Sequence, residues 1–298
     1  MGPQLQRRAA GFVRRGALVA AVGALLFLTG CSAEQKHEWT NFAMPDPATK
    51  QADYIFNLWH WAWVAALLTG AVVWGLIFWS IFRYRRRSDD EVPIQTRYNL
   101  PLEIFYTIAP VIMVVVFFYW TVNTQNAVLQ DTKQDHTVTV VGQQWSWTFN
   151  YTDEEATGGE GTNVYTSGNG SNIPTLVLPV DETTQFNLRS PDVIHSFGIP
   201  AFLMRMDVIP GRENFYEVTP TTVGTFRGKC YELCGVYHSR MLFNVEVVSR
   251  EDFDAHLREL QDAGFESEKP VIGGENSRTP AGLEHLSLDE DDSEEGSQ

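Results

Sequence analysis

The chain has few cysteines and few basic residues. Its 298 residues include three cysteines, and 22 lysines and arginines against 37 aspartates and glutamates, for a formal net charge of -15. Three cysteines are too few for a domain held together by several disulfides. The shortage of basic residues argues against a nucleic-acid partner, because phosphates require a basic surface. A Cys-x-x-Cys-His run is also absent, so no c-type haem attachment is predicted. The odd cysteine count needs another explanation.

Residues 1–30 have the features of an export signal. They contain four arginines and no acid, and the apolar run 16–28 has the length of a signal-peptide hydrophobic region rather than of a membrane span. The run ends in Leu-Thr-Gly-Cys31, which is similar to the bacterial lipobox, where the cysteine takes a lipid after cleavage. We predict a lipoprotein signal peptide over 1–30, lipidation of Cys31 and an exported segment over 31–52. The alternative is an ordinary signal peptide or a short anchor.

Two long apolar segments predict a transmembrane hairpin over residues 53–130. No charged residue occurs between positions 54 and 82, and a second apolar segment covers about 104–122 with Pro110 inside it. Both are long enough to span a bilayer. The basic cluster at 83–87 marks the cytoplasmic side of the first span. We therefore expect a bacterial cell-membrane protein with two spans and its C-terminal half on the outer face.

A hairpin is more than a lipid-anchored domain needs for attachment, so it suggests packing against a larger membrane partner. Glu103 lies at the cytoplasmic start of the second segment. An acid at a helix N-terminus is favourable with the helix dipole, which is one interpretation of this residue. The other is a carboxylate that takes up protons at the membrane surface.

The region 135–262 predicts an all-β domain. Runs of alternating, β-branched and aromatic residues separated by turn residues are typical of a sandwich or barrel. The predicted strands are 136–141, 144–149, 175–178, 184–188, 213–218 and 241–248. Residues 153–174 predict a surface loop and 251–261 a closing helix. Residues 263–298, which end in the acidic run 289–295, predict a disordered tail.

Within this region, Cys230, Cys234, His238 and Met241 form a Cys-x3-Cys-x3-His-x2-Met motif. Thiolates and a thioether are soft ligands that select copper over magnesium or calcium. The spacing differs from that of common zinc sites. His195 is a further candidate imidazole. A disulfide or a catalytic cysteine is an alternative for the thiols, but neither explains the neighbouring histidine and methionine, so copper is the most economical interpretation.

This motif and three further blocks resemble cytochrome c oxidase subunit II of bacterial aa3-type haem-copper oxidases. The blocks are Gln144-Trp-Ser-Trp147, Asp192-Val-Ile-His195 and Asp207-Val-Ile-Pro-Gly-Arg212, and the resemblance covers about residues 52–262. It implies a two-helix transmembrane hairpin followed by an all-β cupredoxin-like Greek-key barrel. It also implies a function: accepting electrons from cytochrome c and passing them to haem in subunit I, where oxygen reduction is coupled to proton pumping.

In that family the metal site is a binuclear copper centre called CuA. The resemblance implies that Cys230 and Cys234 bridge both copper ions. It further implies that His195 and His238 each bind one copper and that Met241 is a weak ligand.

Other positions take roles through the same resemblance. Glu232 would give its backbone carbonyl to copper, with its side chain facing a magnesium or manganese ion shared with subunit I. Electrons would enter through Trp145, Glu103 would stand at the start of a proton pathway, and Asp192 would help to dock the donor. Ser146 departs from the family, which usually has an aromatic residue at that position.

The implied partners are oxidase subunit I, other oxidase subunits, the lipid bilayer and an electron donor. The donor is either a soluble cytochrome c or a haem c subunit of a neighbouring bc complex, and an acidic face would steer a basic one. The alternative function is a membrane-tethered copper-binding or copper-chaperone protein. Such a protein would need neither the hairpin nor the block around Trp145.

Overall fold

The computed structural model describes residues 33–88, 91–92, 94–130, 132–169 and 172–272. The predicted signal peptide, Cys31 and the acidic run 289–295 lie outside these ranges. The chain divides into two compact units after Pro45. The first unit contains the short helix α2 (Ala33–Thr40), and the second contains the long helices and the β-domain.

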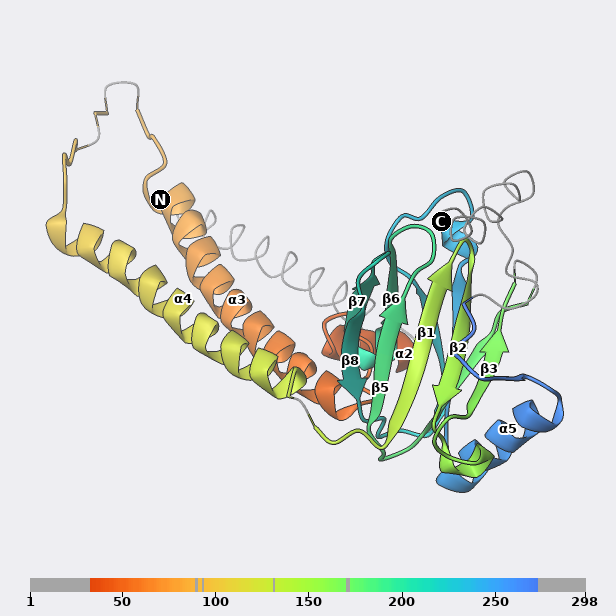
Figure 1. The fold of residues 1–298 in the computed structure, drawn as a ribbon. Helices are drawn as coiled ribbons and strands as arrows, with labels where there is room; N and C mark the ends of the chain where they lie inside the picture. The colour runs from red at the N-terminus through yellow and green to blue at the C-terminus, as the bar shows by residue number, and fades with distance from the viewer. Residues whose placement is uncertain (1–32, 89–90, 93, 131, 170–171, 273–298) are drawn as a thin grey trace, which may run out of the picture. The chain divides into compact units, whose positions relative to one another are not determined.

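Two long helices, α3 (Lys50–Arg83) and α4 (Leu100–Val128), lie side by side (Figure 1). Side chains cap both N-termini: Thr49 accepts from the backbone N–H of Ala52 at 3.0 Å, and Asn99 from that of Leu102 at 3.3 Å. Each helix is long and apolar enough to cross a membrane. Their apolar side chains point largely outward, and α4 has no buried residue.

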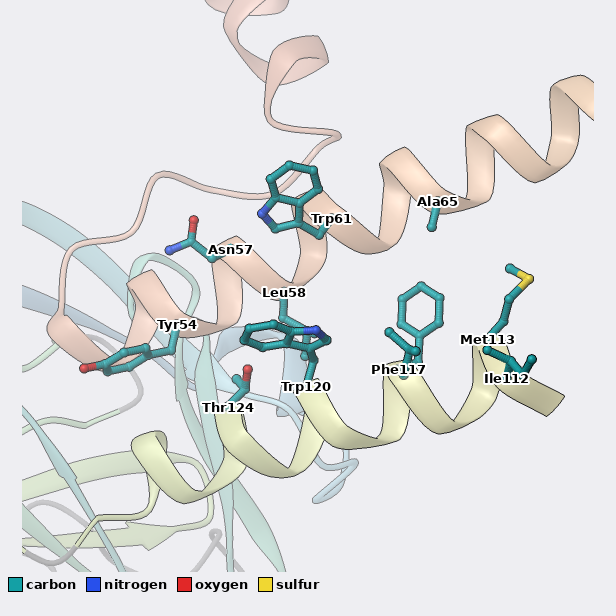
Figure 2. A pocket seen from close by; sticks show the side chains of 11 residues that line it. Tyr54, Asn57, Leu58, Trp61, Ala65, Ile112, Met113, Phe117, Trp120 and Thr124 are labelled. Atoms are coloured by element: carbon teal, nitrogen blue, oxygen red, sulfur yellow. The ribbon is translucent and has the colours of Figure 1, made fainter. Parts of the chain in front are cut away.

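A cavity of about 600 Å³ lies between the two helices. Figure 2 shows polar side chains, those of Tyr54, Asn57 and Thr124, at one end of it, and Phe117 and Met113 further along. The exposed apolar side chains of the two helices suit contact with lipid or with the helices of another membrane subunit.

The β-domain consists of two sheets (Figure 1). The first has the order β11-β3-β2-β1-β5-β8, and the second has the order β4-β10-β9-β6-β7. The first is built from β1 (His136–Gln143), β2 (Ser146–Thr152), β3 (Asn163–Ser167), β5 (Thr184–Arg189), β8 (Asn214–Val218) and β11 (Glu266–Ser267). The second is built from β4 (Thr175–Pro179), β6 (His195–Ile199), β7 (Met204–Val208), β9 (Gly224–Cys230) and β10 (Leu242–Val248). The pairs β1–β5 and β4–β10 are parallel, and the other neighbouring strands are antiparallel, so both sheets are mixed.

The core between the sheets is aromatic. Phe197 and Phe243 stack at 4.8 Å between ring centroids, and Trp147 meets both rings edge-on. The Phe243 ring lies so close to Gly228 that a Cβ at this position would come within 1.9 Å of it, so only glycine fits at position 228 of β9. All three aromatic side chains are buried, and this packed layer supports the strand ends that carry the candidate ligands.

Helix α5 (Arg250–Asp262) confirms the predicted closing helix, and Ser249 caps its N-terminus by accepting from the backbone N–H of Asp252 at 3.1 Å.

The prediction of a surface loop over 153–174 was wrong, because this segment contains the 3-10 turn η1 (Glu155–Thr157) and the strand β3, which pairs with β2. The strand predicted from position 144 begins instead at Ser146. Strands β7 and β9 were not predicted, because charged residues and glycines interrupt their alternation.

The predicted disordered tail also differs over its described part, residues 263–272. Strand β11 pairs with β3, and Asn150 binds the backbone of Val271 in both directions. The N–H of Val271 donates to Asn150 Oδ1 at 2.6 Å, and Asn150 Nδ2 donates to the Val271 carbonyl at 3.2 Å. A buried side-chain amide holds this segment, so hydrophobic periodicity gives no sign of it.

Candidate metal centre

Three of the five candidate ligands lie at strand ends of the second sheet. His195 opens β6, Cys230 closes β9, and Met241 directly precedes β10. The antiparallel register of β6 and β9, which pairs Phe197 with Cys230, brings the first two together although they are 35 residues apart in the chain. Cys234 and His238 lie in the connection between β9 and β10, where η3 (His238–Arg240) forms a short turn.

The side chains converge on the two cysteines. Cys230 Sγ lies 3.9 Å from His195 Nδ1 and 3.9 Å from Cys234 Sγ. Cys234 Sγ in turn lies 3.5 Å from His238 Nδ1 and 3.8 Å from Met241 Sδ. Both cysteines are unpaired and buried, and the ligand atoms of His195, Cys230 and Cys234 lie within 4.8 Å of one another.

This donor set fits a soft metal. Half of the distance between the two sulfurs is shorter than a metal–thiolate bond of about 2.3 Å, so one ion can contact both. Thiolates, imidazoles and a thioether are soft or borderline ligands that favour metals such as copper over magnesium or calcium, and the cluster fits a copper site. The structure therefore brings together the five side chains that the sequence singles out.

The two thiols differ in acidity. Burial raises the pKa of Cys230, but the hydrogen bond with His195 and the backbone hydrogen bonds at Ser196 and Glu232 outweigh burial and bring the pKa to about 7. Burial and the neighbouring Cys230 sulfur raise the pKa of Cys234 to about 12. The pair thus holds one negative charge readily, and a second requires a cation beside it, which a metal supplies.

Asp192 orients His195 rather than standing free at the surface. Its Oδ1 lies 2.8 Å from His195 Nε2, and its Oδ2 accepts from the backbone N–H of Gln144 at 2.6 Å. Burial raises the pKa of Asp192, but these hydrogen bonds, His195 first, lower it below its usual range. Because Nε2 faces the carboxylate, Nδ1 is left to face the sulfur of Cys230, an arrangement that fixes the ring for metal binding.

Replacing Asp192 with Asn tests this positioning role. The amide cannot act as a charged acceptor for His195, so we expect copper affinity to fall by about 10–100-fold, the usual effect of losing a partner of a ligand histidine. Competition with a copper chelator measures the affinity. Unchanged affinity combined with weaker donor binding would instead favour the predicted docking role alone.

A second network holds the other ligand loop. Gln144 Nε2 donates to the backbone carbonyl of Cys234 at 2.7 Å, and Trp145 Nε1 donates to the same carbonyl at 3.2 Å. The indole of Trp145 also meets the Tyr237 ring edge-on at 5.0 Å. The family resemblance implies a role for Trp145 but none for the Gln144 side chain or for Tyr237. The two hydrogen bonds join residues 90 and 89 positions apart in the chain, so local sequence spacing does not predict them.

The two carboxylates proposed for other roles lie apart from this cluster. The Glu232 carbonyl lies 3.3 Å from Cys230 Sγ, while its side chain is exposed. Glu103 belongs to the first turn of α4, where its Oε1 accepts from the backbone N–H of Asn99 at 2.9 Å. A first-turn carboxylate that accepts from the backbone N–H of the N-cap residue stabilises the helix N-terminus, so Glu103 has at least a capping role.

Two family models match the chain. Residues 37–121 match the transmembrane domain of cytochrome c oxidase subunit II, and residues 136–248 match its periplasmic domain. Together they span both long helices almost to the end of α4, and nearly all of the β-domain. The predicted fold class, a two-helix hairpin followed by a cupredoxin-like β-domain, is confirmed.

Curated proteins are similar over most of the chain. A probable cytochrome c oxidase subunit 2 of Streptomyces coelicolor is 45% identical, covering 85% of this chain and 89% of that protein. Cytochrome c oxidase subunit 2 of Corynebacterium diphtheriae is 33% identical, covering 85% of this chain and 86% of that protein. Among solved structures, the periplasmic domain of cytochrome oxidase subunit II of Bradyrhizobium japonicum is 28% identical, covering 44% of this chain and 97% of that one, with a TM-score of 0.39.

Proposed function

The chain belongs to the cytochrome c oxidase subunit II family and is a component of an oxidase complex, and from this premise we propose that it accepts electrons from a cytochrome c at a binuclear copper centre. The electrons then pass to haem in subunit I, which reduces oxygen and couples the reaction to proton pumping. The observation that carries the proposal is the convergence of two buried cysteines, two histidines and a methionine.

Each side chain at the proposed copper centre has its own ligand role. The two cysteines would bridge the metals, His195 and His238 would each bind one, and Met241 would be a weak ligand. A bound copper pair supplies a one-electron carrier whose charge is spread over two metals and two sulfurs. The buried aromatic layer behind β6 and β10 limits movement of the ligands, which favours fast electron transfer because little rearrangement is needed.

Trp145 is proposed as the residue through which electrons enter. It is partly exposed, and its indole N–H reaches the Cys234 carbonyl, so a single hydrogen bond connects it to a ligand residue. Exposed apolar side chains of Leu233, Val236 and Tyr237 lie in the same ligand loop. An apolar patch of this kind suits close contact with a donor, and Asp192 would contribute charge at its edge.

The remaining assignments follow from the family and from the sequence. The β-domain would lie on the outer face of the membrane, Cys31 would carry a lipid, and the Glu232 side chain would face a magnesium or manganese ion shared with subunit I. The donor would be a soluble cytochrome c or a haem c subunit of a bc complex.

Spectroscopy of the purified oxidase complex tests the copper assignment. We expect an electron paramagnetic resonance signal in which one unpaired electron is shared by two coppers. A single-copper signal, or copper present only in the reduced state, would instead support the second candidate, a copper-binding or chaperone protein.

Glu103 is proposed as the start of a proton pathway, and replacing it with Gln separates this role from capping. The amide oxygen can still accept from the Asn99 N–H, so the helix start is retained, whereas the side chain can no longer carry a proton. We expect slower proton uptake in reconstituted vesicles with an unchanged copper signal. Unchanged turnover would leave Glu103 with its capping role alone.

A further inference from the structure

A buried charged cluster lies in the β-domain, built from residues other than the candidate ligands. Its centre is His136 at the start of β1, only 3% exposed. His136 Nδ1 lies 2.8 Å from Glu154 Oε2, and His136 Nε2 lies 2.8 Å from Glu182 Oε2. The two carboxylates come from different turns, one before η1 and the other between β4 and β5.

Helix α5 completes the cluster. Arg250 Nη1 donates to Glu182 Oε2 at 2.7 Å and lies 3.3 Å from His136 Nε2, while Arg250 Nε donates to Asp254 at 2.8 Å. The buried ring of Phe253 meets the imidazole edge-on at 5.0 Å. The imidazole therefore connects β1, both turns and α5.

The geometry favours a protonated imidazole. A neutral imidazole has one N–H and one lone pair, so it can donate to only one of two carboxylates. In that form the Nε2 lone pair would face Glu182 and could be satisfied only by Arg250. An imidazolium donates to both carboxylates. Glu154 is only 4% exposed and its Oε1 has no hydrogen-bond partner among the described residues, so its charge depends on His136 for compensation.

We infer that His136 is a protonated clamp that fastens helix α5 and the segment before η1 to the β-domain, and that this attachment loosens when the imidazole loses its proton. On deprotonation Glu182 loses its imidazole donor, and Glu154 keeps a bond only to a neutral ring. Helix α5 remains attached through Phe253 and Leu257, which are fully buried, so the expected change is more frequent local opening rather than unfolding.

The groups around the imidazole shift its pKa in opposite directions. Burial lowers the pKa of His136, and the charge of Arg250 lowers it further. Glu154 raises the pKa most and Glu182 adds to this, so the net pKa lies above the ordinary value of 6.5. A group whose pKa is raised in the folded state stabilises it at low pH. That contribution is lost as the pH rises through the folded-state pKa.

Nuclear magnetic resonance of the full-length chain in lipid nanodiscs, labelled with ¹⁵N only at histidine, tests the protonation state. The signals of His136 are identified by their loss in His136→Gln. We expect both ring nitrogens to carry protons at about pH 7, where an ordinary histidine is largely neutral. His256 on α5 is the internal reference, because burial lowers its pKa. A His136 ring with one bare nitrogen at that pH would overturn the inference.

Hydrogen exchange of the same preparation tests the attachment. After division by the intrinsic exchange rate, protection of the α5 amides is expected to fall as the pH rises, by about tenfold for each unit by which the pKa is raised. Glu154→Gln should weaken this dependence, and Glu155→Gln, which removes the neighbouring exposed charge, should leave it intact. Protection that shows the same pH dependence in the wild type and in Glu154→Gln would contradict the clamp.

Discussion

Replacing either Cys230 or Cys234 with Ser is expected to abolish the two-copper signal and the uptake of electrons from cytochrome c. Both sulfurs lie at the centre of the cluster, and each is within 4 Å of the other and of a histidine nitrogen. A serine hydroxyl is a hard, weakly acidic ligand and does not replace a thiolate for copper. Electron paramagnetic resonance and steady-state oxygen consumption measure the two losses.

Cys31→Ser is the matched control, because it removes the third cysteine of the chain without touching the cluster. It should keep the copper signal, while mass spectrometry of the N-terminus reports whether a lipid has been lost. A normal two-copper spectrum in Cys230→Ser or in Cys234→Ser would refute the assignment of the bridging ligands.

Replacing Trp145 with Phe is expected to cause the second large effect. Phenylalanine keeps an aromatic ring but loses the N–H that reaches the Cys234 carbonyl at 3.2 Å. We expect electron transfer from the donor to fall by about tenfold or more, corresponding to at least about 1.4 kcal/mol in the barrier, with copper content and spectrum retained. Stopped-flow reduction of the copper centre by cytochrome c measures the rate.

Gln144→Leu separates the two ways in which Trp145 could act. It removes the other donor to the same carbonyl, at 2.7 Å, and leaves the indole in place. If Trp145 serves only to support the ligand loop, both variants should shift the copper spectrum and slow the transfer alike. If electrons enter through the indole, the slow transfer should be specific to Trp145→Phe.

The sequence was informative where the signal is local. Uncharged apolar segments of sufficient length predict membrane helices, because the bilayer imposes a length and a composition on any span. The ligand motif likewise predicts a copper site, because Cys230, Cys234, His238 and Met241 lie within twelve residues of one another. The odd cysteine count follows the same interpretation: two thiols belong to the cluster, and Cys31 remains the predicted lipid site.

The sequence was less informative where a segment is held by partners far away in the chain. Strand β3 has no clear alternation, and β2 and β11 hold it on either side. The described part of the predicted tail lies on the first sheet because Asn150, 121 residues earlier, pairs with the backbone of Val271. Composition made both segments resemble loops, since polar contacts rather than apolar burial position them.

Spacing and residue chemistry thus determined the two spans, the all-β domain and the five candidate ligands. Only the tertiary structure decided how these ligands are supported: Asp192 against His195, Gln144 and Trp145 on the Cys234 carbonyl, and His136 between two carboxylates. The physical reason is that sheet register and turn geometry bring these groups together. A hydrogen bond across 48 or 90 residues depends on the whole fold, whereas a ligand motif or an apolar span depends on neighbours in the chain.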